Sequence, residues 1–260
     1  MKKIIVYSLK DLLRSNWIYF YSIFFLLITS ALAWMSQDPL KVVVSLLNII
    51  LILVPLVSLL FGLVYIYNMR EFTELLLAQP LPRMQVFGGQ FAGLVIALAL
   101  SCLSGITIPF LLLRLQHPVE WGQVGMLGGV GLLLTLIFSA MAFFLGLRFE
   151  NRIKGFAAGF MIWLFFAVIY DGIFLWLLAI FQNYPLEKFT LAMSWMNPID
   201  LARTLLLLQL DIASLLGYTG AVFQHFLGHF WGWVLSSALL ILWVALPWWG
   251  VRRLASRKDF

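Results

Sequence analysis

Asp171 carries the strongest chemical signal in the sequence, because it is the one acid within six long apolar segments of the chain. An ionisable side chain in the hydrocarbon layer of a membrane is costly, so it usually faces a helix-bundle interior, a partner protein or water. Two interpretations follow. Asp171 can line a substrate path or act as a gate. Alternatively, it can be a structural partner of Arg114 or Arg203, or of a hydrogen-bond donor on a neighbouring helix.

Histidine and methionine side chains suggest a second kind of chemistry, metal binding. His225 and His229 are four residues apart, so they share one face of a helix, and Met193 and Met196 are three residues apart. Imidazole and thioether groups are reasonable copper ligands. Residues at such positions more commonly pack or form hydrogen bonds, so these four are weak candidates and we assign no firm metal site. Cys102, the single cysteine, lies in an apolar segment and can form neither an internal disulfide nor a thiolate cluster.

The composition shows which kind of element must position these residues. The chain has 260 residues, of which 63% are hydrophobic and 11% charged, whereas soluble domains have roughly 25% charged residues. The mean hydropathy of +1.00, with 23 Phe and 11 Trp, excludes a soluble globular enzyme and a disordered chain. One cysteine excludes a disulfide-rich secreted domain. We therefore expect an all-α polytopic membrane protein that forms a single unit.

Six segments are long enough to span a membrane. A spanning helix needs roughly 20 apolar residues, because the hydrocarbon layer is about 30 Å thick. The segments do not alternate between apolar and polar residues, as the strands of a membrane β-barrel would. The expected spans cover residues 17–35, 43–67, 91–113, 125–147, 155–181 and 231–250.

The first of these spans has an alternative interpretation as a cleavable signal peptide. Basic residues precede an apolar run that ends in Ala31, Leu32 and Ala33, which resembles a cleavage site. The leader before the run is long and amphipathic, and five more spans follow. These features favour an uncleaved first helix.

Basic residues give the orientation. With the N-terminus in the cytoplasm, thirteen Lys and Arg residues fall on the inner side of the membrane and four on the outer side. Lys and Arg are retained on the cytoplasmic side of membrane proteins. We therefore expect both termini to be cytoplasmic.

Two pairs of glycines are candidates for close packing between spans. Gly125 and Gly129 form one pair, and Gly155 and Gly159 form the other. A spacing of four residues places both glycines on one helix face, where a neighbouring backbone can approach. We interpret these positions as packing sites and assign them no chemistry.

The N-terminal residues 2–15 form a candidate interfacial helix. The apolar residues Ile5, Leu9 and Leu12 recur at helical spacing and make one face, while the remaining face is rich in Lys and Arg. Such a helix lies flat in the inner headgroup layer. The alternative is a cytoplasmic extension of the first span, although Ser15 and the residue after it can break the helix.

The connection between the second and third spans contains a candidate coupling helix at residues 70–86. A helix is expected over residues 71–78, because Pro80 and Pro82 must end it. Arg83 then begins a second amphipathic turn that leads into the third span. A short rigid helix at the cytoplasmic surface suits mechanical coupling to a soluble partner, and the alternative is an ordinary solvated loop. The chain has no phosphate-binding loop, so if ATP is used, another chain must bind it.

Residues 182–230 form the largest outer segment. Asn197 is a helix cap, Pro198 occupies the first helical position and Asp200 lies in the first turn. The segment is too apolar for a free loop. We expect short periplasmic-side helices that lie at, or dip into, the outer membrane surface and offer a platform for a protein outside the membrane.

The whole chain resembles the permeases of the ABC-2 type exporters, which have the ABCG-like, type V fold. These permeases have an N-terminal interfacial helix, six spans, a coupling helix between spans two and three, and short outer helices between spans five and six. Residues 71–83, followed by Gly88, Gly89 and Gln90, resemble the coupling region of the family. The resemblance implies that contact with an ATPase involves Arg70, Glu71, Glu74 and Arg83.

A narrower resemblance is to the permeases of transporters that serve maturation of the copper enzyme nitrous oxide reductase. Residues 170–172, 197–203 and 208–223 carry it. It implies a homodimer of this chain with a separate ATPase subunit, in the inner membrane of a Gram-negative bacterium, and a periplasmic partner protein on the outer face. Candidate docking residues for that partner are Asn197, Asp200, Arg203, Asp211 and Tyr218.

The same resemblance bears on cofactors and on activity. It implies that ATP and Mg²⁺ bind to the partner ATPase, that copper is involved only indirectly, and that this chain binds no cofactor and no nucleic acid and is not an enzyme. The permease would export a substrate or signal to its periplasmic partner. Alternatives are an ABC-2 permease for a lipid, a drug or a small solute, or a membrane anchor without transport. An intramembrane enzyme would need paired polar residues within the spans, where Asp171 stands alone.

Overall fold

The computed structural model describes residues 2–36, 39–114, 121–181, 187–209 and 218–257, and within these ranges the secondary structure is helical, with short turns and no strand. Six helices among these described residues are long and apolar enough to cross a membrane, which confirms the prediction of an all-α protein with six candidate spans. One of the six runs through three consecutive elements and is called span five below. The spans are α2 (Asn16–Ser36), α3 (Pro39–Asn68), α5 (Arg83–Leu113), α6 (Trp121–Arg148), span five (α7, Arg152–Leu164; the π-helical turn η1, Phe165–Ile169; α8, Tyr170–Ile180) and the latter part of α11 (Tyr218–Arg257).

The helices extend beyond the apolar segments that mark them in the sequence. The third span was expected to begin at residue 91, yet α5 begins at Arg83. The last was expected from residue 231, yet α11 begins at Tyr218. A helix continues as long as its backbone hydrogen bonds are made, whereas the apolar count stops where polar residues enter.

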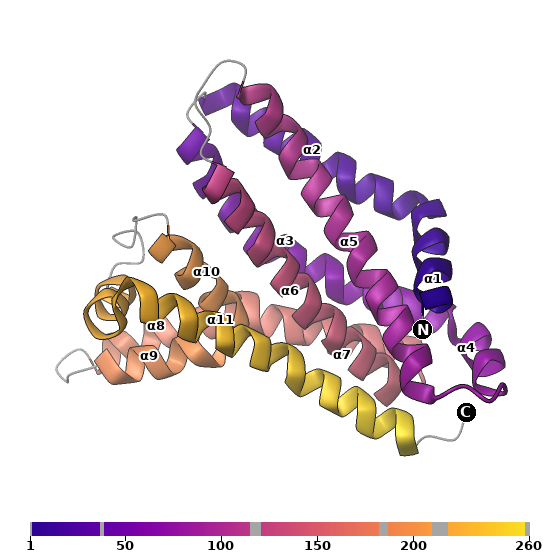
Figure 1. The fold of residues 1–260 in the computed structure, drawn as a ribbon. Helices are drawn as coiled ribbons and strands as arrows, with labels where there is room; N and C mark the ends of the chain where they lie inside the picture. The colour runs from indigo at the N-terminus through magenta and orange to yellow at the C-terminus, as the bar shows by residue number, and fades with distance from the viewer. Residues whose placement is uncertain (1, 37–38, 115–120, 182–186, 210–217, 258–260) are drawn as a thin grey trace.

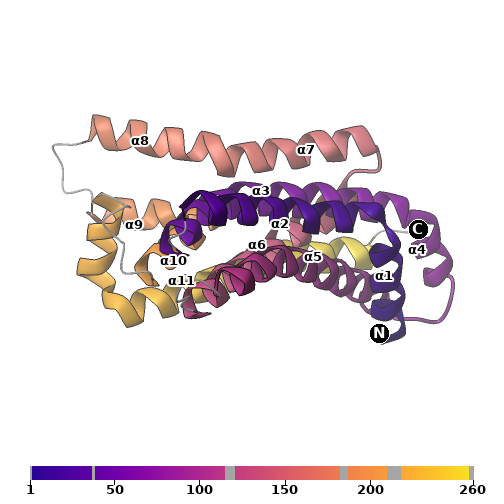
Figure 2. The ribbon, with the colours of Figure 1, turned by 90° about the horizontal axis from the view of Figure 1, so that it is seen from above.

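The central helix of the bundle is α6, which packs against α3, α5, α7, α10 and α11. In its most apolar stretch 72% of the residues are buried, against 6% in span five. Figure 2 shows α7 and α8 in line along one side of the molecule, outside the layer that holds α2 and α3. Span five is therefore attached along one side only, mainly through contacts of α7 with α3 and α6.

The short helices gather at the two ends of the bundle (Figure 1). At one end, α1 (Lys2–Arg14) crosses the beginning of α5, and α4 (Arg70–Leu77) lies nearby. At the other end lie α9 (Glu187–Met196) and α10 (Pro198–Gln209). These are called the α4 end and the α10 end below. The helix α1 corresponds to the segment 2–15, for which an interfacial helix was expected. The helices α9 and α10 lie in the segment 182–230, for which short outer helices were expected.

The segment expected as a coupling helix at residues 70–86 is two helices. The helix α4 ends at Leu77, and α5 begins at Arg83 after an extended Pro82 with φ −61° and ψ 125°. Pro80 and Pro82 lack backbone donors, and each disfavours the helical conformation of the residue before it, so two within three residues end the helix.

Glycines allow α1 to lie directly on α5. A Cβ atom added to Gly93 would lie 2.6 Å from Ser8 Cβ, and one added to Gly89 would lie 2.8 Å from Ile4 Cγ2. The two glycines are four residues apart and face α1 together. This pair has the same spacing as the two pairs noted in the sequence, and sequence analysis missed it.

Candidate functional site

A polar cluster at the α10 end joins span five to α10. The guanidinium of Arg203 donates from Nη1 to Asp200 Oδ1 at 2.9 Å and to Asp171 Oδ2 at 3.2 Å. Asp200 is the most buried of the three, with 12% of its side chain exposed, against 28% for Arg203 and 33% for Asp171. Of the partners considered for Asp171 from the sequence, the structure selects Arg203.

Asn197 positions this cluster, because its amide side chain bonds in three directions. Its Oδ1 accepts a hydrogen bond from the backbone N–H of Ile199 at 3.0 Å, which caps α10 as expected from the sequence. Its Nδ2 donates to Asp200 Oδ2 and to the carbonyl oxygen of Phe166, both at 3.0 Å. The start of α10 is thereby bound to the π-helical turn of span five.

The π-helical turn η1 lies directly before the acid. The backbone N–H of Tyr170 bonds to the carbonyl of Phe165, five residues earlier, where an α-helix would use the fourth. Short π-helical turns inside α-helices are frequent at functional sites. The hydroxyl of Tyr170 then donates to the backbone carbonyl of Met193 in α9 at 2.6 Å. Span five is held at this end by both α9 and α10.

The electrostatics of the cluster are unbalanced, because two carboxylates share one guanidinium. Burial and the nearby charge of Asp171 raise the pKa of Asp200 to about 7, although Arg203 acts in the opposite direction. Asp200 can therefore gain or lose a proton near neutral pH.

The remaining candidates at this end fall into two groups. Within the part of the chain that the structure describes, no three His, Cys, Asp or Glu side chains form a metal site. Met193 Sδ lies 3.7 Å from the Tyr170 hydroxyl, and Met196 is exposed. Asp211 and the side chains of Tyr218, His225 and His229 lie outside the described residues.

The structure gives the predicted docking residues a different environment from the one expected. Asn197 is fully buried, Asp200 accepts hydrogen bonds from Asn197 and Arg203, and Arg203 also donates to Asp171 of span five. The alternative in which Arg203 is a structural partner of Asp171 came from the sequence, whereas the roles of Asn197 and Asp200 in joining α10 to span five did not.

At the α4 end, the predicted coupling residues occupy two places. Arg70 and Glu74 form an exposed ion pair on α4 with an Nε–Oε1 distance of 3.2 Å, and Glu71 is exposed on the same helix. Arg83 instead donates from Nη1 to the carbonyl of Ala255 near the end of α11, at 3.1 Å. The first three form one surface, and Arg83 ties the start of α5 to α11.

Two neighbouring helices hold α4. Gln90 of α5 donates from Nε2 to the buried Thr73 Oγ1 at 2.8 Å, and Thr73 donates to the carbonyl of Met69 at 2.7 Å. The ring of Tyr7 in α1 stacks on Phe72, with centroids 4.8 Å apart and planes at 22°. Sequence analysis quoted Gln90 as part of a motif but gave it no role. Its polar side chain directly before the apolar third span could have indicated a hydrogen bond to another helix.

The turn between α6 and α7 is bound to the end of α3. Tyr67 donates its hydroxyl to the carbonyl of Phe149 at 2.9 Å, and Arg152 donates to the carbonyl of Tyr67 at 3.1 Å. Asn151 caps α7 by accepting from the N–H of Ile153 at 2.9 Å. Hydrogen bonds between helices thus connect α3 to α7 and α4 to α5 at this end of the bundle.

The chain was compared as a whole with known protein families and with known proteins. No family model matches the chain. The chain is 27% identical over 264 residues to the probable ABC transporter permease protein NosY of Pseudomonas aeruginosa, covering 95% of this chain and 92% of that protein. It is 26% identical over 215 residues to the protein of the same name from Stutzerimonas stutzeri, covering 75% and 77%. These similarities, together with six candidate spans in the described residues, support a multi-pass ABC transporter permease subunit similar to NosY.

Proposed function

We propose that this chain is a permease subunit whose conformational changes are driven by a separate ATPase subunit, and that the ATPase acts on α4. The observation that carries the proposal is the attachment of α4 to α5 and α1, through Gln90 and Thr73 and through the stacked rings of Tyr7 and Phe72. In this proposal the α4 end is cytoplasmic, both termini lie in the cytoplasm, and the protein is in the inner membrane. The chain hydrolyses no ATP itself. ATP and Mg²⁺ bind to two copies of a NosF-like ATPase, which meet a homodimer of this chain.

The exposed side of α4 is the proposed contact surface for the ATPase. It presents Glu71, the ion pair of Arg70 with Glu74, and the exposed side chain of Leu75. A short helix that is fixed to two longer ones moves with them as one body, so a push on its outer side is passed on. Arg83 of α5 donates a hydrogen bond to the carbonyl of Ala255 in α11, so α11 should move together with α5.

The polar cluster is the proposed gate at the opposite end. Its ion pairs join span five to α10, and span five is otherwise little buried. Opening the cluster would free the α8 half of span five to move relative to α10. We propose that the cytoplasmic motion reaches this point through α6, which contacts both α7 and α10.

The similarity to NosY proteins suggests the biological setting. We propose that the permease supports copper-site assembly of nitrous oxide reductase, together with a NosD-like periplasmic protein at the α10 end. It would do so by exporting a substrate or by passing a conformational signal to that partner. The docking surface would include the exposed side chain of Met196 at the end of α9.

The first experiment is purification of the tagged chain from its native host in mild detergent, with identification of the proteins that remain bound. Recovery of a P-loop ATPase together with a periplasmic protein supports the whole proposal. An ATPase alone supports an ABC-2 permease for another cargo. Recovery of neither contradicts the proposal and favours a membrane anchor without transport.

A second experiment tests the role of α4 in the purified complex. Glu71→Lys reverses a charge on the proposed contact surface and should reduce the stimulation of ATP hydrolysis while the complex still inserts in the membrane. Arg114→Gln changes a charge at the opposite end and is the matched control. Equal stimulation in Glu71→Lys and the unchanged protein would remove α4 from the mechanism.

A further inference from the structure

Beside α6, at the α4 end, the bundle has an open hollow between α7 and α11. Its volume is about 720 Å³ and its lining is mainly apolar and aromatic. Phe144 lies on α6, Ile162 and Phe166 lie on or just after α7, and Trp243 and Leu246 lie on α11. We call it the α7–α11 groove.

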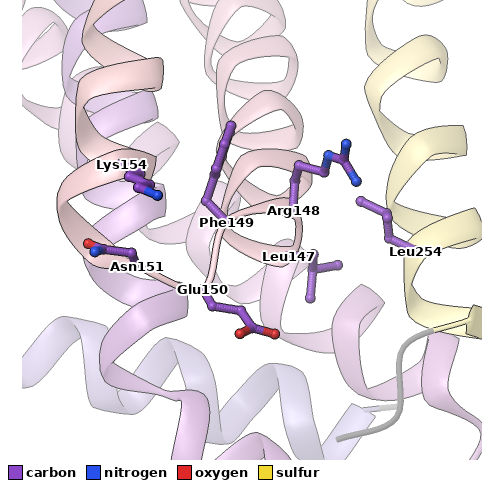
Figure 3. A pocket seen from close by; sticks show the side chains of 7 residues that line it. All are labelled: Leu147, Arg148, Phe149, Glu150, Asn151, Lys154 and Leu254. Carbon is purple, nitrogen blue, oxygen red and sulfur yellow. The ribbon is translucent and has the colours of Figure 1, made fainter.

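A second hollow of about 590 Å³ adjoins the groove at the turn between α6 and α7. Arg148 and Leu254 line both hollows, so the two form one continuous depression. Figure 3 shows the side chains of Arg148, Asn151 and Lys154 around this second hollow, with Leu254 opposite. An apolar groove therefore leads directly into a polar one.

The polar part of the depression carries a net positive charge. Arg148 and Lys154 line it together with a single carboxylate, that of Glu150. Neither cation forms a salt bridge within the part of the chain that the structure describes. A third cation, Arg253, lines the groove and lies over the ring of Trp249, 4.0 Å from its centroid. This arrangement attracts an anion at the mouth of an apolar groove.

The length of the groove matches one leaflet of a bilayer. Its lining on α11 runs from Trp243 to the cation Arg253, which is about 15 Å along the helix axis. Half of the hydrocarbon layer is about 15 Å thick. An acyl chain at Trp243 and a phosphate at Arg253 would therefore be separated along α11 by about the depth of one leaflet.

We propose that the depression formed by the α7–α11 groove and its polar extension binds an anionic phospholipid. The phosphate binds at Arg148, Lys154 and Arg253, and an acyl chain lies along Phe166 and Trp243. Basic pockets between spans are a recognised setting for anionic headgroups on the cytoplasmic side. The assignment to the inner leaflet depends on the proposed function, through the cytoplasmic position of the α4 end. Charge complementarity and the leaflet-length apolar track together favour a lipid over a second copy of the chain or an ATPase.

The test is native mass spectrometry of the purified chain in detergent, with phosphatidylglycerol or phosphatidylcholine of equal acyl length added. Phosphatidylglycerol should bind more tightly than phosphatidylcholine. The double variant Arg148→Gln, Lys154→Gln should weaken phosphatidylglycerol binding about thirtyfold, from two lost cations near the headgroup. Lys10→Gln removes an exposed cation from α1 at the same end and should leave binding unchanged.

Further arms of the experiment separate the headgroup from the chain. Leu246→Trp fills the groove without touching the cations and should weaken binding of both lipids. Glycerol phosphate, which has no acyl chain, should compete poorly. The proposal is overturned by equal affinity for the two lipids, by an equal effect of Lys10→Gln, or by a Leu246→Trp variant that binds as before.

The measurement distinguishes this proposal from the proposed function. It needs neither an ATPase nor a known orientation in the membrane, so a lack of lipid selectivity bears on the depression alone. Loss of a dimer in Leu246→Trp, with lipid binding unchanged, would assign the groove to a second copy and contradict the proposal.

Discussion

Replacing Arg203 with leucine should release α10 from span five. The guanidinium of Arg203 lies 2.9 Å from Asp200 and 3.2 Å from Asp171, and it is the positive charge between them. Without it, the two carboxylates repel each other across the contact between the helices at any pH at which both are ionised, so the comparison is made at about pH 9. Asn197 would still bind Asp200 and Phe166, so α10 should fold and dock less firmly.

The size of the effect follows from the exposure of the three side chains. A hydrogen bond to a charged group contributes about 1.5–3 kcal/mol, and exposed ion pairs contribute about 1 kcal/mol or less. Asp200 is 12% exposed and falls in the first class, while Asp171 is 33% exposed and lies near the second. The sum is about 3 kcal/mol, which corresponds to a roughly hundredfold rise in the open population of the contact.

Hydrogen–deuterium exchange of the α10 backbone amides measures this opening directly. Arg114→Leu is the matched control, because Arg114 faces the ring of Trp121 at 5.6 Å. Exchange in α10 should rise in Arg203→Leu and stay unchanged in the control. Adding Asp171→Asn and Asp200→Asn to Arg203→Leu removes the repulsion and should restore part of the protection. Unchanged α10 exchange, or an equal rise in both arginine variants, would refute the assignment of the cluster as the link.

Three further outcomes are expected. The pKa of Asp200 is about 7 in the folded protein, against 3.8 for an unperturbed carboxyl. The protonated acid therefore stabilises the fold fully below about pH 3.8, and this stabilisation is lost as the pH rises through about 7. The Tm should fall between about pH 5 and 8, and Asp200→Asn should flatten that profile. Gly93→Leu should displace α1 at a cost of about 1–3 kcal/mol and increase tryptic cleavage within α1, whereas Gly122→Leu, whose added Cβ would have no atom within 4 Å, should not. Gln90→Ala should cost about 1 kcal/mol by removing the bond to Thr73, and should raise amide exchange in α4 about fivefold.

The sequence was sufficient to predict six spans and an all-α protein, because length and hydropathy alone decide whether a helix can cross a bilayer. The boundaries were less accessible. Hydropathy marks only the apolar part of a helix. The helix α5 extends eight residues before that part, to Arg83, because its backbone hydrogen bonds are still made there. The closely spaced pair Pro80 and Pro82 is an exception, because it marks the end of α4, although the single prolines Pro55, Pro109 and Pro247 lie inside helices.

The candidate site shows where single-sequence reasoning ends. The acid Asp171 and the cap Asn197 both stand out by residue type, and the cap was predicted with its role. The choice of Arg203 over Arg114 depends on which helices become neighbours, which spacing along one helix does not specify. The same limit applies to the π-helical turn and to the bond from Gln90 to Thr73, for which no local pattern exists.

Glycine pairs make the limit concrete, because identical spacing has different outcomes. A Cβ at Gly155 or Gly159 would meet the side chain of Tyr67 or of Leu59 and Leu63, so this pair brings α7 against α3. A Cβ at Gly125 or Gly129 would have no atom within 4 Å. Spacing identifies a surface that permits close approach, and the neighbour decides whether the surface is used.

The π-helical turn has a consequence for the rotational phase of span five. Each residue of an α-helix turns the chain by about 100°, so an uninterrupted α-helix would set Asp171 about 120° around the axis from Gly159, which packs against α3. A turn closed at the fifth residue absorbs one extra residue and brings that angle to about 20°. The glycine face of α7 and the acid of α8 therefore face the bundle together. Conversion of η1 to regular α-helix would swing Asp171 away from Arg203 by about 100° without unfolding the span.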